Sequence, residues 1–82
     1  MNTKVEIQIE IEGDQPHRLV VEPWGGTYIL RPLTEYSVCL EGDDRLPLSL
    51  RIGQSHTVLS CFDSAGASLM VLRNGVEMSV DE

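Results

Sequence analysis

The chain has 82 residues, a length that predicts one small domain. Its hydrophobic content of 41% and charged content of 23% are those of an ordinary globular protein, which excludes a largely disordered chain. The formal net charge of −7, from 13 acidic and 6 basic residues, opposes direct binding to nucleic acid or to an anionic membrane.

The N-terminal segment, residues 4–12, alternates aliphatic and polar side chains with a period of two. This period predicts a β-strand with one apolar face and one solvated, acidic face that carries Glu6, Glu10 and Glu12. With Gln8 between Glu6 and Glu10, successive positions on such a face lie about 6.6–7 Å apart, which is similar to the spacing of phosphates along a nucleic-acid strand. Two interpretations stay open: a face that binds a basic partner by mimicking nucleic acid, or a charged edge strand that only discourages aggregation.

The same N-terminus lacks the pattern of a signal peptide. No apolar run approaches the roughly 18 residues that span a bilayer. We therefore expect a cytoplasmic protein that does not bind membranes. In that compartment the two cysteines, Cys39 and Cys61, are expected to be free buried thiols rather than a disulfide.

Short β-prone segments follow, separated by Gly, Pro, Asp and Ser, and none has the length and period of an amphipathic helix. We expect a single domain over residues 1–82 with an all-β fold. About seven or eight short strands would form a small antiparallel sandwich or barrel. The expected strands are residues 17–22, 27–31, 36–41, 48–52 and 56–62, followed by a hairpin over 68–80.

The final hairpin is the most specific structural prediction. Asn74 and Gly75 both tolerate a positive φ, and together they are the preferred pair for a two-residue type I′ turn. That turn sets the register of the two strands. Four pairs of facing residues follow from it: Arg73 with Val76, Leu72 with Glu77, Val71 with Met78, and Leu69 with Val80.

This register separates the apolar residues of the hairpin between two faces. The side chains expected to share the core face are those of Leu69, Val71, Met78 and Val80. Met70 and Leu72 then point to the outer face, beside Ser79 and Glu77. Two large apolar side chains on an outer face need a cover or a partner.

The only tryptophan, Trp24, lies in the stretch "EPWGGTYILRP" at positions 22–32, between a proline and two glycines. Pro23 cannot donate a hydrogen bond to a sheet, so it predicts the end of a strand and the start of a turn. Trp24 has two interpretations. It can fold back to cover one end of the core, or it can anchor a partner together with Tyr28 and Arg31, because these residue types are enriched at interfaces.

The stretch around this turn resembles small uncharacterised bacterial all-β proteins with a Glu-Pro-Trp turn. The match covers about 20 residues, and Pro32-Leu33 stands where such proteins often have Pro-Gly. The resemblance implies an all-β fold and a bacterial or phage origin, and it implies no activity. The matching residues are Glu22, Pro23, Trp24, Gly25, Tyr28, Leu30, Pro32 and Tyr36.

Patterns typical of catalytic and metal sites do not occur in the sequence. His56, Ser60 and Asp63 lie near one another but lack the context of a nucleophile elbow. No glycine-rich phosphate loop occurs. Nor do the histidines and cysteines have the spacing of metal ligands; they are His17, Cys39, His56 and Cys61. We therefore expect no enzyme activity, no metal and no cofactor.

These features together predict a protein-binding module that docks on a basic partner through an acidic surface with apolar and aromatic contacts. Such a module would act as an inhibitor or immunity-type protein against a basic nuclease or a nucleic-acid-handling complex. The candidate contact residues are Glu6, Glu10, Glu12, Trp24, Tyr28, Arg31, Asp43, Asp44, Met70 and Leu72.

Two alternatives come from other classes of function. One is a small-molecule-binding β-barrel whose mouth is lined by Trp24, Tyr28 and Tyr36. The other is a structural homodimer in which sheet pairing covers Met70 and Leu72. In both, the negative charge serves only solubility.

Overall fold

The computed structural model describes residues 3–42, 47–61 and 67–79, and this part of the chain consists of β-strands joined by turns and loops, without a helix. The predicted all-β class is therefore confirmed. None of these residues belongs to a helix that could cross a membrane. The strands are β1 (Thr3–Ile9), β2 (His17–Glu22), β3 (Gly26–Leu30), β4 (Tyr36–Gly42), β5 (Leu48–Ile52), β6 (His56–Cys61), β7 (Ser68–Arg73) and β8 (Val76–Glu77).

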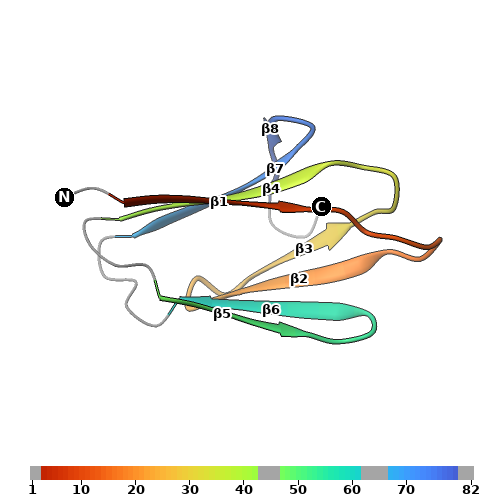
Figure 1. Ribbon diagram of the computed structural model, residues 1–82, viewed down its shortest axis with the longest axis horizontal. Coiled ribbons are helices and arrows are strands. Elements are labelled where there is room, and N and C mark those ends of the chain that lie inside the picture. Colours follow the sequence, from red (N-terminus) through yellow and green to blue (C-terminus); the bar gives the residue numbers. More distant parts are fainter. Residues whose placement is uncertain (1–2, 43–46, 62–66, 80–82) are drawn as a thin grey trace.

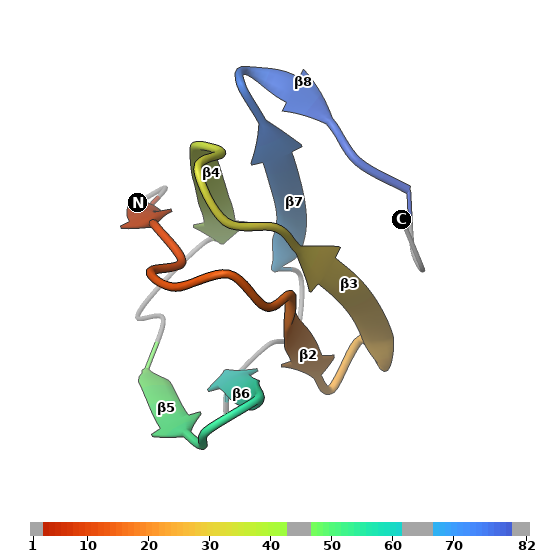
Figure 2. The ribbon, with the colours of Figure 1, turned by 90° about the vertical axis from the view of Figure 1, so that its right-hand side faces the viewer.

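The strands form two four-stranded sheets that pack face to face as a sandwich (Figure 1). We call the sheet with strand order β1-β4-β7-β8 sheet A and the sheet with order β3-β2-β6-β5 sheet B. The chain crosses between the sheets after β1, β3, β4 and β6. Viewed along the strands, β1 lies opposite β5 at one side of the sandwich, and β3 approaches β7 and β8 at the other (Figure 2).

One pair of strands departs from the antiparallel arrangement that the short turns predicted. β2 and β6 run parallel, with Arg18 opposite His56 and Glu22 opposite Ser60. The two strands belong to separate hairpins, β2–β3 and β5–β6, which lie side by side in sheet B. A parallel pair needs a long connection between its strands, and here the chain from Glu22 to His56 passes through sheet A before it returns.

The core lies between the two sheets and follows from the alternation of side chains along each strand. In β4, for example, Tyr36, Val38 and Leu40 are buried, while Ser37 and Cys39 between them are only half-buried. Strand geometry sends alternate side chains to opposite faces, so every second residue of β2, β3, β4 and β6 enters the core. The buried apolar residues are Leu19, Val21, Tyr28, Leu30, Tyr36, Val38, Leu40, Leu59, Cys61, Val71 and Met78.

The β7–β8 hairpin has the predicted turn. Asn74 and Gly75 have φ values of 51° and 84°, as a type I′ turn requires. Arg73 faces Val76 and Leu72 faces Glu77, which confirms those two pairs of the predicted register. Beyond the ladder, the Met78 N–H donates to the Val71 carbonyl at 2.8 Å. Val80 lies outside the described residues.

The connection between β3 and β4 is closed by a tyrosine. The Arg31 backbone N–H donates to the Tyr36 hydroxyl at 2.8 Å, five residues along the chain. The contact is similar to a tyrosine corner, in which the hydroxyl of a tyrosine near the start of a strand forms a hydrogen bond with the backbone a few residues upstream. It satisfies the polar end of a ring that is otherwise buried in the core.

The tight turn between β2 and β3 contains the tryptophan. The Gly25 N–H donates to the Val21 carbonyl at 2.8 Å, and Gly25 has a φ of 80° that favours glycine. Trp24 is half-buried and packs against the core cluster. This packing supports the interpretation in which Trp24 covers one end of the core.

Burial differs sharply between two leucines that face each other in sheet B, and this predicts a difference in stability. Leu59 on β6 is 1% exposed, whereas its partner Leu50 on β5 is 48% exposed. We expect Leu59→Ala to lower the free energy of unfolding by about 2–5 kcal/mol, because it leaves a cavity in the core. The matched control Leu50→Ala should cost less than about 1 kcal/mol. Urea unfolding followed by Trp24 fluorescence measures both, and equal losses would contradict the exposed position of Leu50.

Candidate functional site

The outer face of sheet A brings together three of the residues predicted to bind a partner. Cross-strand pairing places Glu6 beside Cys39, and Cys39 beside Met70. Two residues further along the pair of strands, and therefore on the same face, Leu72 lies beside Ser37. Met70 is 42% exposed and Leu72 is half-buried. The outer face of sheet A therefore has an apolar centre, and Glu6 lies at its β1 margin.

The β1 margin of this face is acidic. Glu6 is exposed on β1, and Glu10 and Glu12 are exposed on the segment that follows it, because the strand ends at Ile9 and does not continue to residue 12 as predicted. Among the described residues no ion pair neutralises these three carboxylates. The one cation of the segment, Lys4, already lies 3.9 Å from the Glu41 carboxylate. Both groups of that pair are solvent-exposed, where an ion pair contributes little to stability. The margin therefore keeps an excess of negative charge that is available to a basic group.

The other predicted contact residues do not join this surface. Trp24 precedes β3 and Arg31 follows it, so they lie at opposite ends of that strand. β3 is an edge of sheet B on the side away from β1 (Figure 2). Asp43 and Asp44 lie outside the described residues. The eight candidate residues that the structure describes thus do not form one continuous site, and among them Glu6, Met70 and Leu72 are brought to one face by pairing across a sheet.

Tyr28 belongs to the core and not to an exposed surface. Its side chain is 8% exposed, on the inner face of β3 beside Leu19. Burial raises the pKa of the Tyr28 hydroxyl, and the nearby carboxylate of Glu77 raises it further. Tyr36 is buried as well. The two tyrosines therefore fill the core, and they do not line an open mouth with Trp24.

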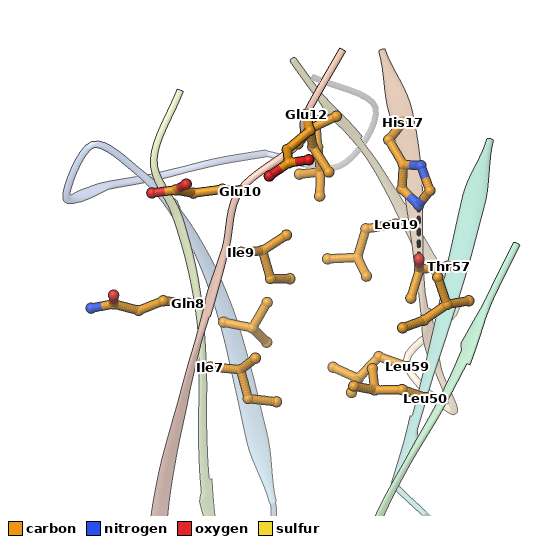
Figure 3. Close-up of a pocket in the computed structure, with 14 residues that line it drawn as sticks. Ile7, Gln8, Ile9, Glu10, Glu12, His17, Leu19, Leu50, Thr57 and Leu59 are labelled. Atoms are coloured by element: carbon orange, nitrogen blue, oxygen red, sulfur yellow. Dashed lines mark hydrogen bonds between the residues drawn. The ribbon is translucent and has the colours of Figure 1, made fainter. Parts of the chain in front are cut away.

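A groove runs between the two sheets on the side where β1 lies opposite β5 (Figure 3). Its volume is about 460 Å³, and its lining is mostly aliphatic. Ile7 and Ile9 project from β1 toward Leu19, Leu59 and Leu50 across the gap, whereas Gln8 and Glu10 point away from it (Figure 3). We call this feature the β1–β5 groove.

Two exposed apolar residues form one wall of the β1–β5 groove. Leu50 and Ile52 face Leu59 and Thr57 on the neighbouring strand, so they point to the inner side of sheet B. Nevertheless Leu50 is 48% and Ile52 is 74% exposed. The sequence predicts the alternation that puts both residues on one face, but that pattern alone implies that they are buried.

One end of the groove is polar. The His17 imidazole lies at hydrogen-bond distance from the Thr57 hydroxyl, with 2.7 Å between Nε2 and Oγ1. Both residues line the groove, as does Glu12 beyond the end of β1. The groove therefore combines an aliphatic interior with a histidine, a threonine and one carboxylate near one end.

The described residues contain no cluster of metal-ligating side chains. No group of three or more His, Cys, Asp or Glu residues among them could hold a metal ion. Cys39 and Cys61 are both free. Cys39 lies on the outer face of sheet A and is only half-buried, which corrects the expectation that both thiols are buried, whereas Cys61 is in the core.

Comparison with known proteins gives no match, whether to a family model, a curated protein or a solved structure. Function is therefore inferred from the two surfaces described above, the outer face of sheet A and the β1–β5 groove.

The environment of Tyr28 predicts how stability depends on alkaline pH. Its pKa is raised above the ordinary tyrosine value of 10.0 in the folded chain, so the folded state favours the neutral phenol. This contribution to stability is complete below the unfolded pKa near 10 and is lost as the pH rises through the folded pKa. We expect Glu77→Gln to lower the pKa of Tyr28 and to reduce the alkaline loss of stability.

Tyrosinate absorbance and urea unfolding across the alkaline range measure these two effects. Glu12→Gln is the matched control, since it removes the same charge at the other side of the sandwich. A Tyr28 pKa that responds equally to both substitutions would contradict a specific effect of Glu77.

Proposed function

We propose that this chain is a non-enzymatic protein-binding module that docks on a basic partner through the outer face of sheet A and its acidic margin. The observation that carries the proposal is the row Glu6–Cys39–Met70, in which one strand, β4, separates an exposed carboxylate from an exposed apolar side chain on the same face. An apolar centre with charged groups around it is the usual anatomy of a protein interface.

The charges determine which partners this surface favours. Glu6, Glu10 and Glu12 lie along one margin, and the chain as a whole carries a net charge of −7. A basic protein would be attracted over a distance of several ångströms and would associate faster at low salt. Nucleic acid and anionic membranes would be repelled by the same field.

A basic protein that handles nucleic acid matches these requirements. The concrete form of the proposal is an inhibitor or immunity-type protein in the cytoplasm of a bacterium or phage-infected cell. It would cover the basic surface of a nuclease or of a nucleic-acid-handling complex. The carboxylates of the β1 margin would occupy positions that phosphates otherwise take, and Met70 with Leu72 would pack against the partner's apolar groups.

The acidic margin can be tested against an equal change of charge elsewhere. We expect the combined substitution Glu6→Gln, Glu10→Gln and Glu12→Gln to weaken capture of a basic partner from lysate by roughly tenfold, because it removes three attractive charges. Affinity capture at low and high salt, read by mass spectrometry, measures this loss.

The matched control is Glu22→Gln, which removes one exposed carboxylate outside that margin, at the end of β2, and is compared with Glu10→Gln alone. It should retain the partner, and high salt should release the partner from the unchanged chain. A partner that is kept at high salt and by the β1-margin variant would contradict docking through this surface.

A further inference from the structure

The two strands beside the β1–β5 groove are both edges. β1 is the terminal strand of sheet A and β5 is the terminal strand of sheet B. Among the described residues, neither has a neighbour on its outer side. Unpaired N–H and C=O groups along an edge are a template on which another strand can pair.

The apolar side chains around this edge lack cover. A strand that extended sheet A beyond β1 would direct alternate side chains inward, toward Ile7, Ile9 and the exposed sides of Leu50 and Ile52. Burial of such aliphatic surface is the main source of favourable free energy in association. The groove thus has both elements of strand addition, which are a free edge for the backbone and an apolar recess for side chains.

The face of β1 that points away from the groove is acidic, so it favours a partner segment with positive charge. The outward side chains of an added strand would lie beside Gln8 and Glu10, which point away from the groove (Figure 3), and beside Glu6, which shares the face of Gln8 by strand alternation. Opposite charges that face each other across two strands stabilise the pair, and like charges destabilise it. A second copy of this chain that paired β1 with β1 would bring two acidic faces together, so a basic segment fits better.

We propose that β1 and the β1–β5 groove accept an extended segment of a partner protein in which aliphatic and basic residues alternate. The segment pairs with the outer edge of β1, its aliphatic side chains enter the groove, and its Lys or Arg side chains lie beside Glu6 and Glu10. This inference rests on the proposed docking to a basic partner and specifies the structure of the part that binds.

A synthetic peptide tests the inference with the intact chain. The probe is a fluorescent peptide of seven alternating Lys and Val residues, which matches the seven residues of β1. We expect it to bind, as measured by fluorescence anisotropy, and to shift the amide NMR signals of β1 and β5. An isomer with the same residues in two blocks should bind at least about tenfold more weakly, because it cannot place apolar and basic groups on opposite faces.

A second pair of probes separates backbone pairing from charge. Methylation of the amide nitrogens along one edge of the alternating peptide removes the donors that a strand needs. If β1 pairs with the peptide, methylation of one edge abolishes binding while methylation of the other edge is tolerated. Equal affinity of both methylated peptides and the parent would overturn strand addition.

Substitutions in the protein locate the recess. Ile52→Gln should weaken binding by roughly tenfold, because it removes exposed aliphatic surface from the groove. Val76→Gln on β8 is the matched control, since Val76 is also an exposed apolar residue, at 69%, on an edge far from the groove. Neither change should alter thermal stability appreciably, because both side chains are largely solvated.

The outcomes distinguish this inference from the proposed function. If Glu6→Gln with Glu10→Gln weakens binding but Ile52→Gln does not, docking on a basic partner stands and strand insertion is wrong. If binding ignores both the charges and salt, the acidic docking itself is wrong. Sedimentation of the chain alone gives the remaining outcome: a dimer that Ile52→Gln disrupts would show that a second copy fills the groove, which overturns the inference.

Discussion

The parallel pairing of β2 with β6 is the constraint from which the rest of the architecture follows. Each strand belongs to its own hairpin, and an isolated hairpin is at best marginally stable in water. Joining the hairpins along residues 18–22 and 56–60 makes one sheet, with β3 and β5 at its edges. Sheet A packs on this sheet with β1 opposite β5 (Figure 2). The groove between these two strands is a consequence of that pairing.

Local structure could be predicted because it depends on a few neighbouring residues. The period of two and the Asn74-Gly75 turn were sufficient for the strand at 48–52 and for the hairpin register. The pairing of β2 with β6 could not be predicted. The two strands lie far apart in the chain, and their short apolar sequences do not indicate which of the other strands each one pairs with. Since this pairing decides which strands are edges, Leu50 and Ile52 could not be distinguished from core residues.

The candidate site, too, could be predicted only as far as the local geometry of each strand determines it. Alternation alone places Glu6, Met70 and Leu72 on an outer face, and the register of β4 with its neighbours brings them together. Tyr28 shows the limit of such reasoning. Its strand is apolar on both faces, so the sequence does not indicate which side chains turn inward. Interface-type residues near one another in sequence, such as Tyr28 and Arg31, can serve the core and the surface respectively.

The two thiols differ in burial, so their rates of alkylation report how often the sandwich opens. Cys39 lies on the outer face of sheet A, and Cys61 is enclosed in the core. A buried thiol is inert until the structure around it opens, whereas a half-buried one reacts from the folded state. Alkylation followed by peptide mapping would thus report two processes in one sample. Cys39 would measure access to the outer face, and the ratio of the Cys61 rate to that of a free thiol would give the free energy of separating the sheets.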